Sequence, residues 1–123
     1  LDDIEHKILR PVFKDPRVHY AVNCASIGCP DLRPSAFSGA RLSADLDAAA
    51  KAYINDARGV EVTDGRVVVS SIYKWFVGDF GGGPAGVLAH LRAHASKNLK
   101  RKLKRVSTID AYRYDWSIND VVK

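Results

Sequence analysis

The segment that most restricts the fold of this chain is residues 60–69, in which two β-branched runs flank an Asp-Gly pair. The runs read VEV and RVVV, and Asp64-Gly65 lies between them. Asp-Gly is a preferred pair for a two-residue turn, because both central residues of a type I′ turn have positive φ. Valine favours extended strands on both sides. The sequence therefore predicts a tight antiparallel hairpin that any fold must accommodate.

The hydrophobic pattern outside the hairpin predicts helices and two further strands. Apolar residues alternate after Val18 and around Tyr112, as in strands with one buried face. Apolar stripes at helical spacing predict helices at residues 1–10, 43–57, 72–76 and 84–103, the last either continuous or broken near Ser96. We expect an α/β or α+β fold, with three to four helices packed on a small mixed sheet. The length of 123 residues suits a single domain, residues 1–123.

The stretch VHYAVNCASIGCP, residues 18–30, carries both cysteines of the chain. Val18, Tyr20 and Val22 would share one face of a strand. The small residues after Cys24 end this pattern, so Cys24 is expected at a strand end, in a polar loop. Loops that follow strands often carry functional residues in α/β folds.

Four segments of the chain resemble the domain-of-unknown-function 547 family. They are LDDIEHKILRP, DPRVHYAVNCASIGCPDLRP, SSIYKWFVGDFGG and YRYDWSIN, and they occur in the family's order. The resemblance implies no activity, because the family has no settled one. It implies a longer domain with helical segments upstream, so that residues 1–123 would be its C-terminal part. Those segments, or a partner chain, would then cover an apolar surface.

One functional hypothesis is a thiol-dependent hydrolase or acyl transferase with the logic of a cysteine peptidase, in which Cys24 is the nucleophile. A nucleophilic thiol needs a base within hydrogen-bond reach. His19 is a poor base, because five residues along a strand span about 16 Å and odd spacing reverses the face. The base would then be His6, His90 or His94. The resemblance favours His6, which lies in the LDDIEHKILRP segment that it covers, and Glu5 or Asp79 would orient it. The candidate substrate-binding residues are Asn23, Ser26, Lys74 and Asp79.

Glu5 is a candidate for a second reason, since it falls inside the apolar arc of the first predicted helix. A carboxylate that faces a core needs a partner, a metal or a proton. The structural alternative to an orienting role is an ion pair with a buried arginine, for which the sequence offers Arg10, Arg17 and Arg33.

The second hypothesis is a non-catalytic protein- or ligand-binding domain, with the SSIYKWFVGDFGG loop as its contact surface. Cys24 would then be a buried, inert cysteine. Cys24 and Cys29 could also form a short disulfide, which would fit an exported or periplasmic protein. A zinc site with His6 and His19 is the weakest alternative, because no pair has standard ligand spacing. We therefore assign no metal and no cofactor.

The net charge of +5 comes from one segment, KNLKRKLKR at residues 97–105. This basic run has six bases and no acid, which leaves 13 bases against 14 acids elsewhere. A solvated helix face is the simplest interpretation, and binding to nucleic acid or to an anionic membrane surface is the alternative. Nucleic acid is not favoured, since no aromatic residue interleaves with the run. No apolar run approaches the length of about 18 residues that spans a bilayer.

Overall fold

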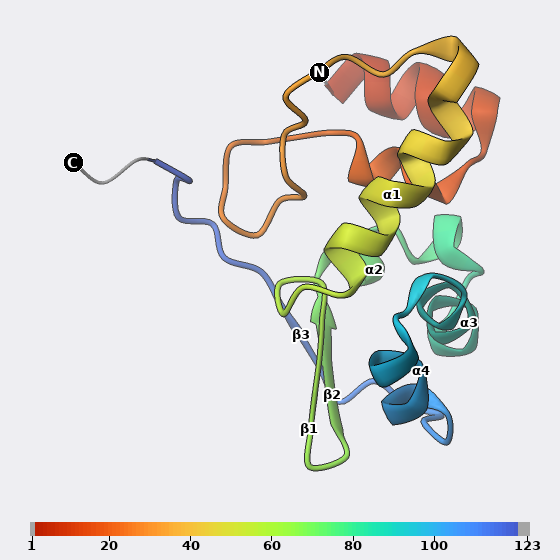
Figure 1. Ribbon diagram of the computed structural model, residues 1–123, viewed down its shortest axis with the longest axis vertical. Helices are drawn as coiled ribbons and strands as arrows, with labels where there is room; N and C mark the ends of the chain where they lie inside the picture. Colours follow the sequence, from red (N-terminus) through yellow and green to blue (C-terminus); the bar gives the residue numbers. More distant parts are fainter. Residues whose placement is uncertain (1, 121–123) are drawn as a thin grey trace.

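The computed structural model describes residues 2–120 and has an α+β fold with a small mixed sheet (Figure 1). The sheet has the order β1-β2-β3, with β1 at Val60–Thr63, β2 at Arg66–Ser70 and β3 at Ala111–Arg113. β1 pairs with β2 antiparallel, and β2 pairs with β3 parallel. The mixed sheet and the fold class are therefore as predicted.

The hairpin between β1 and β2 confirms the prediction from the sequence. Thr63 pairs with Arg66, so Asp64 and Gly65 alone form the turn. Their φ angles are 51° and 77° respectively, and both lie in the left-handed region. Asp64 tolerates this region better than most residues, and Gly65 has no Cβ that would clash there.

Within residues 2–120 the sheet is accompanied by four α-helices and several short 3₁₀ segments. The α-helices are α1 (Leu42–Ile54), α2 (Ile72–Trp75), α3 (Pro84–His94) and α4 (Lys97–Leu103). In the view of Figure 1, α3 and α4 lie to the right of the β1–β2 hairpin and α1 lies above it. The predicted helix at 84–103 is thus two helices that meet at Ser96. Ser96 ends the continuity because its backbone is extended and its hydroxyl accepts a hydrogen bond from the Leu99 N–H, as an N-cap does.

The core lies between α1, α3 and the sheet, and three tyrosines are among its largest fully buried side chains. The Tyr20 hydroxyl lies 2.9 Å from the Tyr73 hydroxyl and 2.8 Å from Nε2 of His90. The Tyr53 hydroxyl donates to the Gly28 carbonyl over 2.6 Å. Buried hydroxyls need such partners, so this network links the loop around Gly28 to the core.

The predicted strand at residues 18–24 is wrong, because the chain forms a 3₁₀ helix there, Pro16–Tyr20. Pro16 restricts φ at its first position, and the Asp15 side chain accepts a hydrogen bond from the Arg17 N–H. Val18, His19 and Tyr20 are all buried, so the apolar alternation does not mark two faces of a strand. His19 and Cys24 therefore do not lie on opposite faces of a strand.

The first helix also differs from its prediction. It runs as a π-helix over Ile4–Phe13, passes Pro11 and ends at Lys14, whose φ is 52°. A proline removes one backbone donor, and the helix continues with hydrogen bonds closed over five residues. Ile4 and Ile8 are about half exposed, so their part of the apolar arc faces solvent, whereas the part at Glu5 and Leu9 is partly or largely covered. The expected covering segment or partner chain stays a prediction, and Leu1 lies outside the described residues.

None of the helices within residues 2–120 has the length and apolar character that a membrane span requires.

We predict that Gly65→Val destabilises the protein by about 1–2 kcal/mol, because valine is strained at positive φ. The hairpin strands should remain paired, so the far-UV circular dichroism spectrum should be kept while the midpoint of urea unfolding falls. Gly39→Val is the matched control, since a Cβ at Gly39 meets no atom within 4 Å and its φ is not in the left-handed region. Equal effects of the two substitutions would contradict the strain argument.

Candidate functional site

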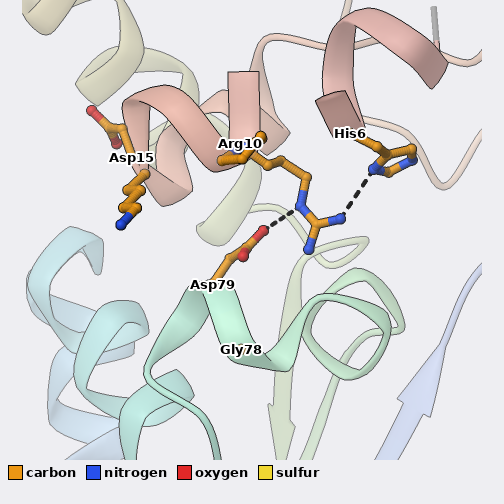
Figure 2. Close-up of a pocket in the computed structure, with 7 residues that line it drawn as sticks. His6, Arg10, Asp15, Gly78 and Asp79 are labelled. Atoms are coloured by element: carbon orange, nitrogen blue, oxygen red, sulfur yellow. Dashed lines mark hydrogen bonds and ion pairs between the residues drawn. The ribbon is translucent and has the colours of Figure 1, made fainter. Parts of the chain in front are cut away.

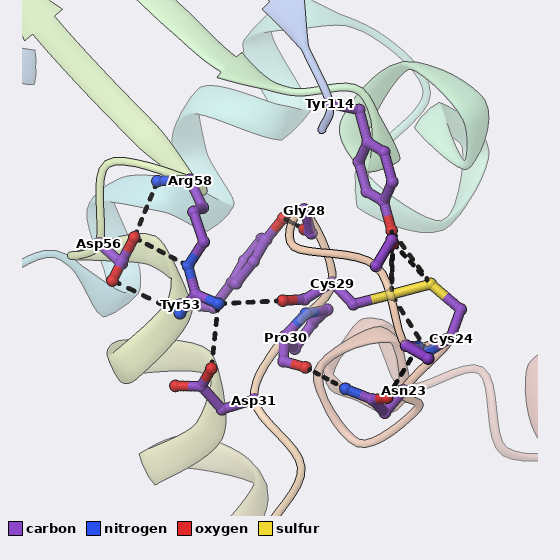
Figure 3. A network of polar contacts seen from close by, with 12 residues as sticks. Asn23, Cys24, Gly28, Cys29, Pro30, Asp31, Tyr53, Asp56, Arg58 and Tyr114 are labelled. Carbon is purple, nitrogen blue, oxygen red and sulfur yellow. Dashed lines mark hydrogen bonds and ion pairs between the residues drawn. A yellow bond between two sulfur atoms is a disulfide. The ribbon is translucent and has the colours of Figure 1, made fainter. Parts of the chain in front are cut away.

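The predicted site residues form two separate groups in the structure. Glu5 and Asp79 lie beside the buried His19, where the π-helix meets the segment after α2, and His6 joins this group through Arg10. Asn23, Cys24 and Ser26 gather around Cys29 and Tyr114 (Figure 3). No described contact joins Cys24 to His6 or Glu5, so the proposed nucleophile, base and orienting group are not assembled into one site.

His19 is the centre of the first group, and its side chain is only 2% exposed. Its Nε2 lies 2.8 Å from Oδ2 of Asp79, and its Nδ1 lies 3.5 Å from Oε1 of Glu5. The ring stacks on Phe76 with 4.4 Å between centroids. Burial lowers the pKa of His19, although Asp79 opposes this shift. An enclosed imidazole with a carboxylate near each nitrogen suits positioning rather than proton transfer to an external substrate.

Arg10 links this cluster to a surface cavity of about 480 Å³ (Figure 2). Its Nε donates to Oδ2 of Asp79 over 2.6 Å, and its Nη1 donates to Nδ1 of His6 over 3.0 Å. Burial would raise the pKa of Asp79, but hydrogen bonds from Arg10 and His19 hold it below its ordinary value. Because Nδ1 of His6 accepts this bond, its Nε2 carries the proton and points away from Arg10.

The cavity has no excess of either charge. Its lining includes the cations Arg10 and Lys14 and the carboxylates Asp15 and Asp79. Asp79 is paired with Arg10, and Asp15 is paired with Arg17 over 2.7 Å. The cavity therefore lies over two ion pairs, and one of them, Arg10–Asp79, attaches the π-helix to the segment after α2.

Glu5 is largely buried, as predicted, with 13% of its side chain exposed, but its predicted arginine partner is wrong. Its ionisable neighbour is His19 instead, because the candidate arginines pair with other carboxylates. Those pairs are Arg10 with Asp79, Arg17 with Asp15 and Asp47, and Arg33 with Asp45. Glu5 also lies with Asp2 and His6 in a group whose ligand atoms fall within 4.8 Å of one another. Exposed groups of this kind are common without a metal, and no second observation marks a site here.

Cys24 and Cys29 form a disulfide in the second group, with 6.2 Å between their Cα atoms (Figure 3). The sequence left this pairing open among three alternatives. Neither sulfur is a thiol in this state, and neither is available to a metal. Cys24 is exposed, whereas Cys29 is 4% exposed. The Tyr114 hydroxyl lies 3.1 Å from the Cys24 sulfur and 2.9 Å from the Cys29 sulfur, so the bond packs against a residue from the other end of the chain.

The disulfide loop also holds the segment after β3 through its backbone. The N–H groups of Ile27 and Gly28 donate to the carbonyls of Ser117 and Asp115, each over 2.8 Å. The Ala25 carbonyl accepts from the Asn119 N–H over the same distance. Gly28 is required at this approach, since a Cβ there would lie 2.9 Å from the Asp115 nitrogen. Asn23 supports the loop, because its side-chain amide donates to the Pro30 carbonyl.

An exposed cluster of aromatic rings lies beside this loop. Trp75, Tyr114 and Trp116 are in mutual contact, with ring centroids 4.7–5.4 Å apart. Trp75 is 46% exposed and Trp116 is 67% exposed, and the nearby Ile27 and Ile118 are also exposed. We call these five residues the aromatic patch. Lys74, a predicted binding residue, is exposed nearby, with its Nζ 5.8 Å from the centre of the Tyr112 ring.

The aromatic patch was not predicted from the sequence, although one pattern indicated part of it. Tyr112, Tyr114 and Trp116 alternate as on one face of a strand, but β3 ends at Arg113. Trp116 therefore lies beyond the sheet and faces solvent. Of the predicted SSIYKWFVGDFGG contact loop, Ile72, Tyr73 and Phe80 are buried, and Trp75 is its exposed aromatic residue.

Comparison with known proteins supports the resemblance seen in the sequence. Residues 1–54 match the model of a family described as a protein of unknown function, DUF547. This match spans the π-helix, the disulfide loop and α1. No curated protein and no solved structure shows a significant match to the chain. The resemblance brings no activity, so function has to be argued from the geometry.

We predict that Asp79→Asn destabilises the protein by about 2 kcal/mol, because it removes the carboxylate that Arg10 and His19 share. Glu5→Gln should have an effect below about 1 kcal/mol, since its contact with His19 is long, 3.5 Å, and burial disfavours the charged form of that imidazole. Both values can be measured by urea unfolding at neutral pH. Asp3→Asn, at an exposed pair with Lys7, should change stability little. A larger loss at Glu5 than at Asp79 would show that the cluster is centred elsewhere.

Proposed function

We propose that this chain is a non-catalytic protein-binding domain and that the aromatic patch is its contact surface. The observation that carries the proposal is the mutual contact of three aromatic rings, two of them tryptophans that remain about half or more exposed. Contiguous exposed apolar groups are uncommon on monomeric proteins and mark interaction sites. Tryptophan and tyrosine are also among the residues that contribute most at protein interfaces.

The surroundings of the patch favour a protein partner. Lys74, Arg113 and Asp115 are exposed around the aromatic rings. An apolar, aromatic centre with a charged rim is the usual anatomy of a protein–protein interface. The rim residues would exclude solvent and set the orientation of the partner, while the tryptophans would supply most of the affinity.

The covalent and hydrogen-bonded support of the patch favours binding without large rearrangement. Tyr114 packs on the disulfide, and Trp116 lies in the segment that residues 25–28 hold through three backbone hydrogen bonds. A contact surface that is ordered before binding loses less conformational entropy when the complex forms. The disulfide thus supports binding in this proposal, rather than serving as the source of a nucleophile.

The thiol-dependent hydrolase or acyl transferase stays a prediction, and it needs a form of the protein other than the one described. Its nucleophile would require reduction of the Cys24–Cys29 bond. Even then, the groups within hydrogen-bond distance of the Cys24 sulfur are the hydroxyls of Ser26 and Tyr114, which are weak bases at neutral pH. His6 is instead engaged by Arg10. The geometry therefore supports binding better than catalysis.

A displayed library of random peptides tests the proposed contact surface. Peptides selected on the oxidised chain should lose affinity by at least about 30-fold for Trp116→Ala, and similarly for Trp75→Ala, because truncation at the centre of an interface typically removes 2 kcal/mol or more. Leu32→Ala is the matched control, since Leu32 is 76% exposed and lies outside the patch. Selected peptides that bind both tryptophan variants as tightly as the unmodified chain would refute the proposal. So would a failure to select any binder.

Alkylation of Cys24 separates the binding proposal from the catalytic prediction. Iodoacetamide at pH 6.5 should modify neither cysteine in the oxidised protein, because both sulfurs are bonded. After mild reduction, Cys24 should react no faster than a thiol of ordinary pKa, and His6→Ala should not slow it. Fast modification that depends on His6 would restore the catalytic hypothesis. Mass spectrometry of the labelled peptides measures both rates.

A further inference from the structure

A basic groove lies on the face of the molecule formed by α3 and α4. It is a hollow of about 460 Å³ lined by five bases and no acid, namely Arg92, Lys97, Lys100, Arg101 and Lys104. All but Arg92 are exposed, as are the adjacent Lys102 and Arg105. None of the ion pairs found among residues 2–120 involves these side chains. The groove therefore carries a positive charge that the described chain does not neutralise.

Helix α4, which carries Lys97, Lys100 and Arg101, is anchored at both ends. At its start, the Asn55 side-chain oxygen accepts from the Ser96 N–H over 2.7 Å, which ties the junction to the end of α1. At its end, the Arg92 guanidinium donates to the carbonyls of Leu103 and Val106, where a helix leaves carbonyls without partners. Leu103, the last residue of α4, is fully buried. These contacts hold the bases of α4 and Arg92 close together, although the repulsion between their positive charges opposes this arrangement.

We propose that the basic groove binds the phosphate groups of anionic phospholipids and attaches the protein to a membrane surface. Clusters of four to eight lysines and arginines on an amphipathic helix are typical of binding to anionic lipid headgroups. Here Leu99 and Leu103 of α4 pack on the core while the bases face outward. The attachment would be peripheral and electrostatic, since none of the exposed large hydrophobic side chains found in the structure belongs to α4.

Two observations favour a lipid surface over nucleic acid. The groove has no aromatic residue on which a base could stack, and its lining is composed of lysine and arginine alone. The second observation is the Cys24–Cys29 disulfide, because disulfides persist mainly in secreted and periplasmic proteins, where membranes are present and nucleic acid is scarce.

Co-sedimentation with vesicles tests the proposal on the full, oxidised chain. The protein should bind vesicles of phosphatidylcholine with phosphatidylglycerol and should not bind phosphatidylcholine alone. Each base near an anionic surface contributes a factor of about five to the partition coefficient. The triple variant in which Gln replaces Lys100, Arg101 and Lys104 should therefore have a partition coefficient roughly 100-fold lower. Their exposure means that the melting temperature should change little, which circular dichroism can check.

The matched control changes the same charge at other exposed positions. This control replaces Lys14, Lys51 and Arg66, which lie outside the groove, together with Gln. Binding to the vesicles should then fall by less than about fivefold. The double variant Lys100→Arg, Lys104→Arg keeps the charge and should bind as the unmodified chain does. Equal losses in the groove variant and the control would mean that net charge alone governs binding, and would overturn the proposal. Tighter binding to a DNA duplex than to vesicles at equal phosphate concentration would overturn it in favour of nucleic acid.

Discussion

The covalent link between Cys24 and Cys29 organises the part of the molecule on which the proposed function depends. It closes a loop whose backbone pairs with residues 115–119, and Tyr114 packs directly on its sulfurs. The same loop presents the Gly28 carbonyl to the buried Tyr53 hydroxyl. One short loop therefore connects the C-terminal segment, the aromatic patch and the core. A cross-link of this kind stabilises mainly by restricting the unfolded chain, and here it also sets the position of a surface.

A second set of contacts attaches the N-terminal helix. Asp79 accepts hydrogen bonds from both Arg10 and His19, and Phe76 stacks on the His19 ring. Residues that the sequence presented as catalytic candidates thus have structural partners in this cluster. A buried histidine beside a carboxylate resembles part of a catalytic site, but the enclosure of His19 and the engagement of both ring nitrogens favour a role in holding elements together.

The two proposed surfaces differ in the physical basis of binding. The aromatic patch would bind through removal of apolar area from water, which depends little on salt. The basic groove would bind through charge, which salt screens over a distance of about 10 Å at 0.1 M. Raising the ionic strength should therefore weaken membrane attachment and leave peptide binding nearly unchanged. This difference allows the two activities to be measured separately on one protein.

Structural features that depend only on residues adjacent in the chain could be predicted from the amino-acid sequence. Asp64-Gly65 between valine runs produced the expected hairpin, and the apolar stripe with Pro84 at its start produced α3, because turn geometry and helix periodicity are local properties. Contacts between residues far apart in the chain, by contrast, depend on how the helices and strands pack together. Residues 18–24 alternate like a strand, yet the cap at Asp15 and the burial of His19 and Tyr20 make part of the segment a 3₁₀ helix. The partner of Glu5, the enclosure of His19 and the meeting of Trp75 with Trp116 likewise join residues far apart in the chain. Local periodicity carries no record of such contacts, since they arise only when the elements pack together.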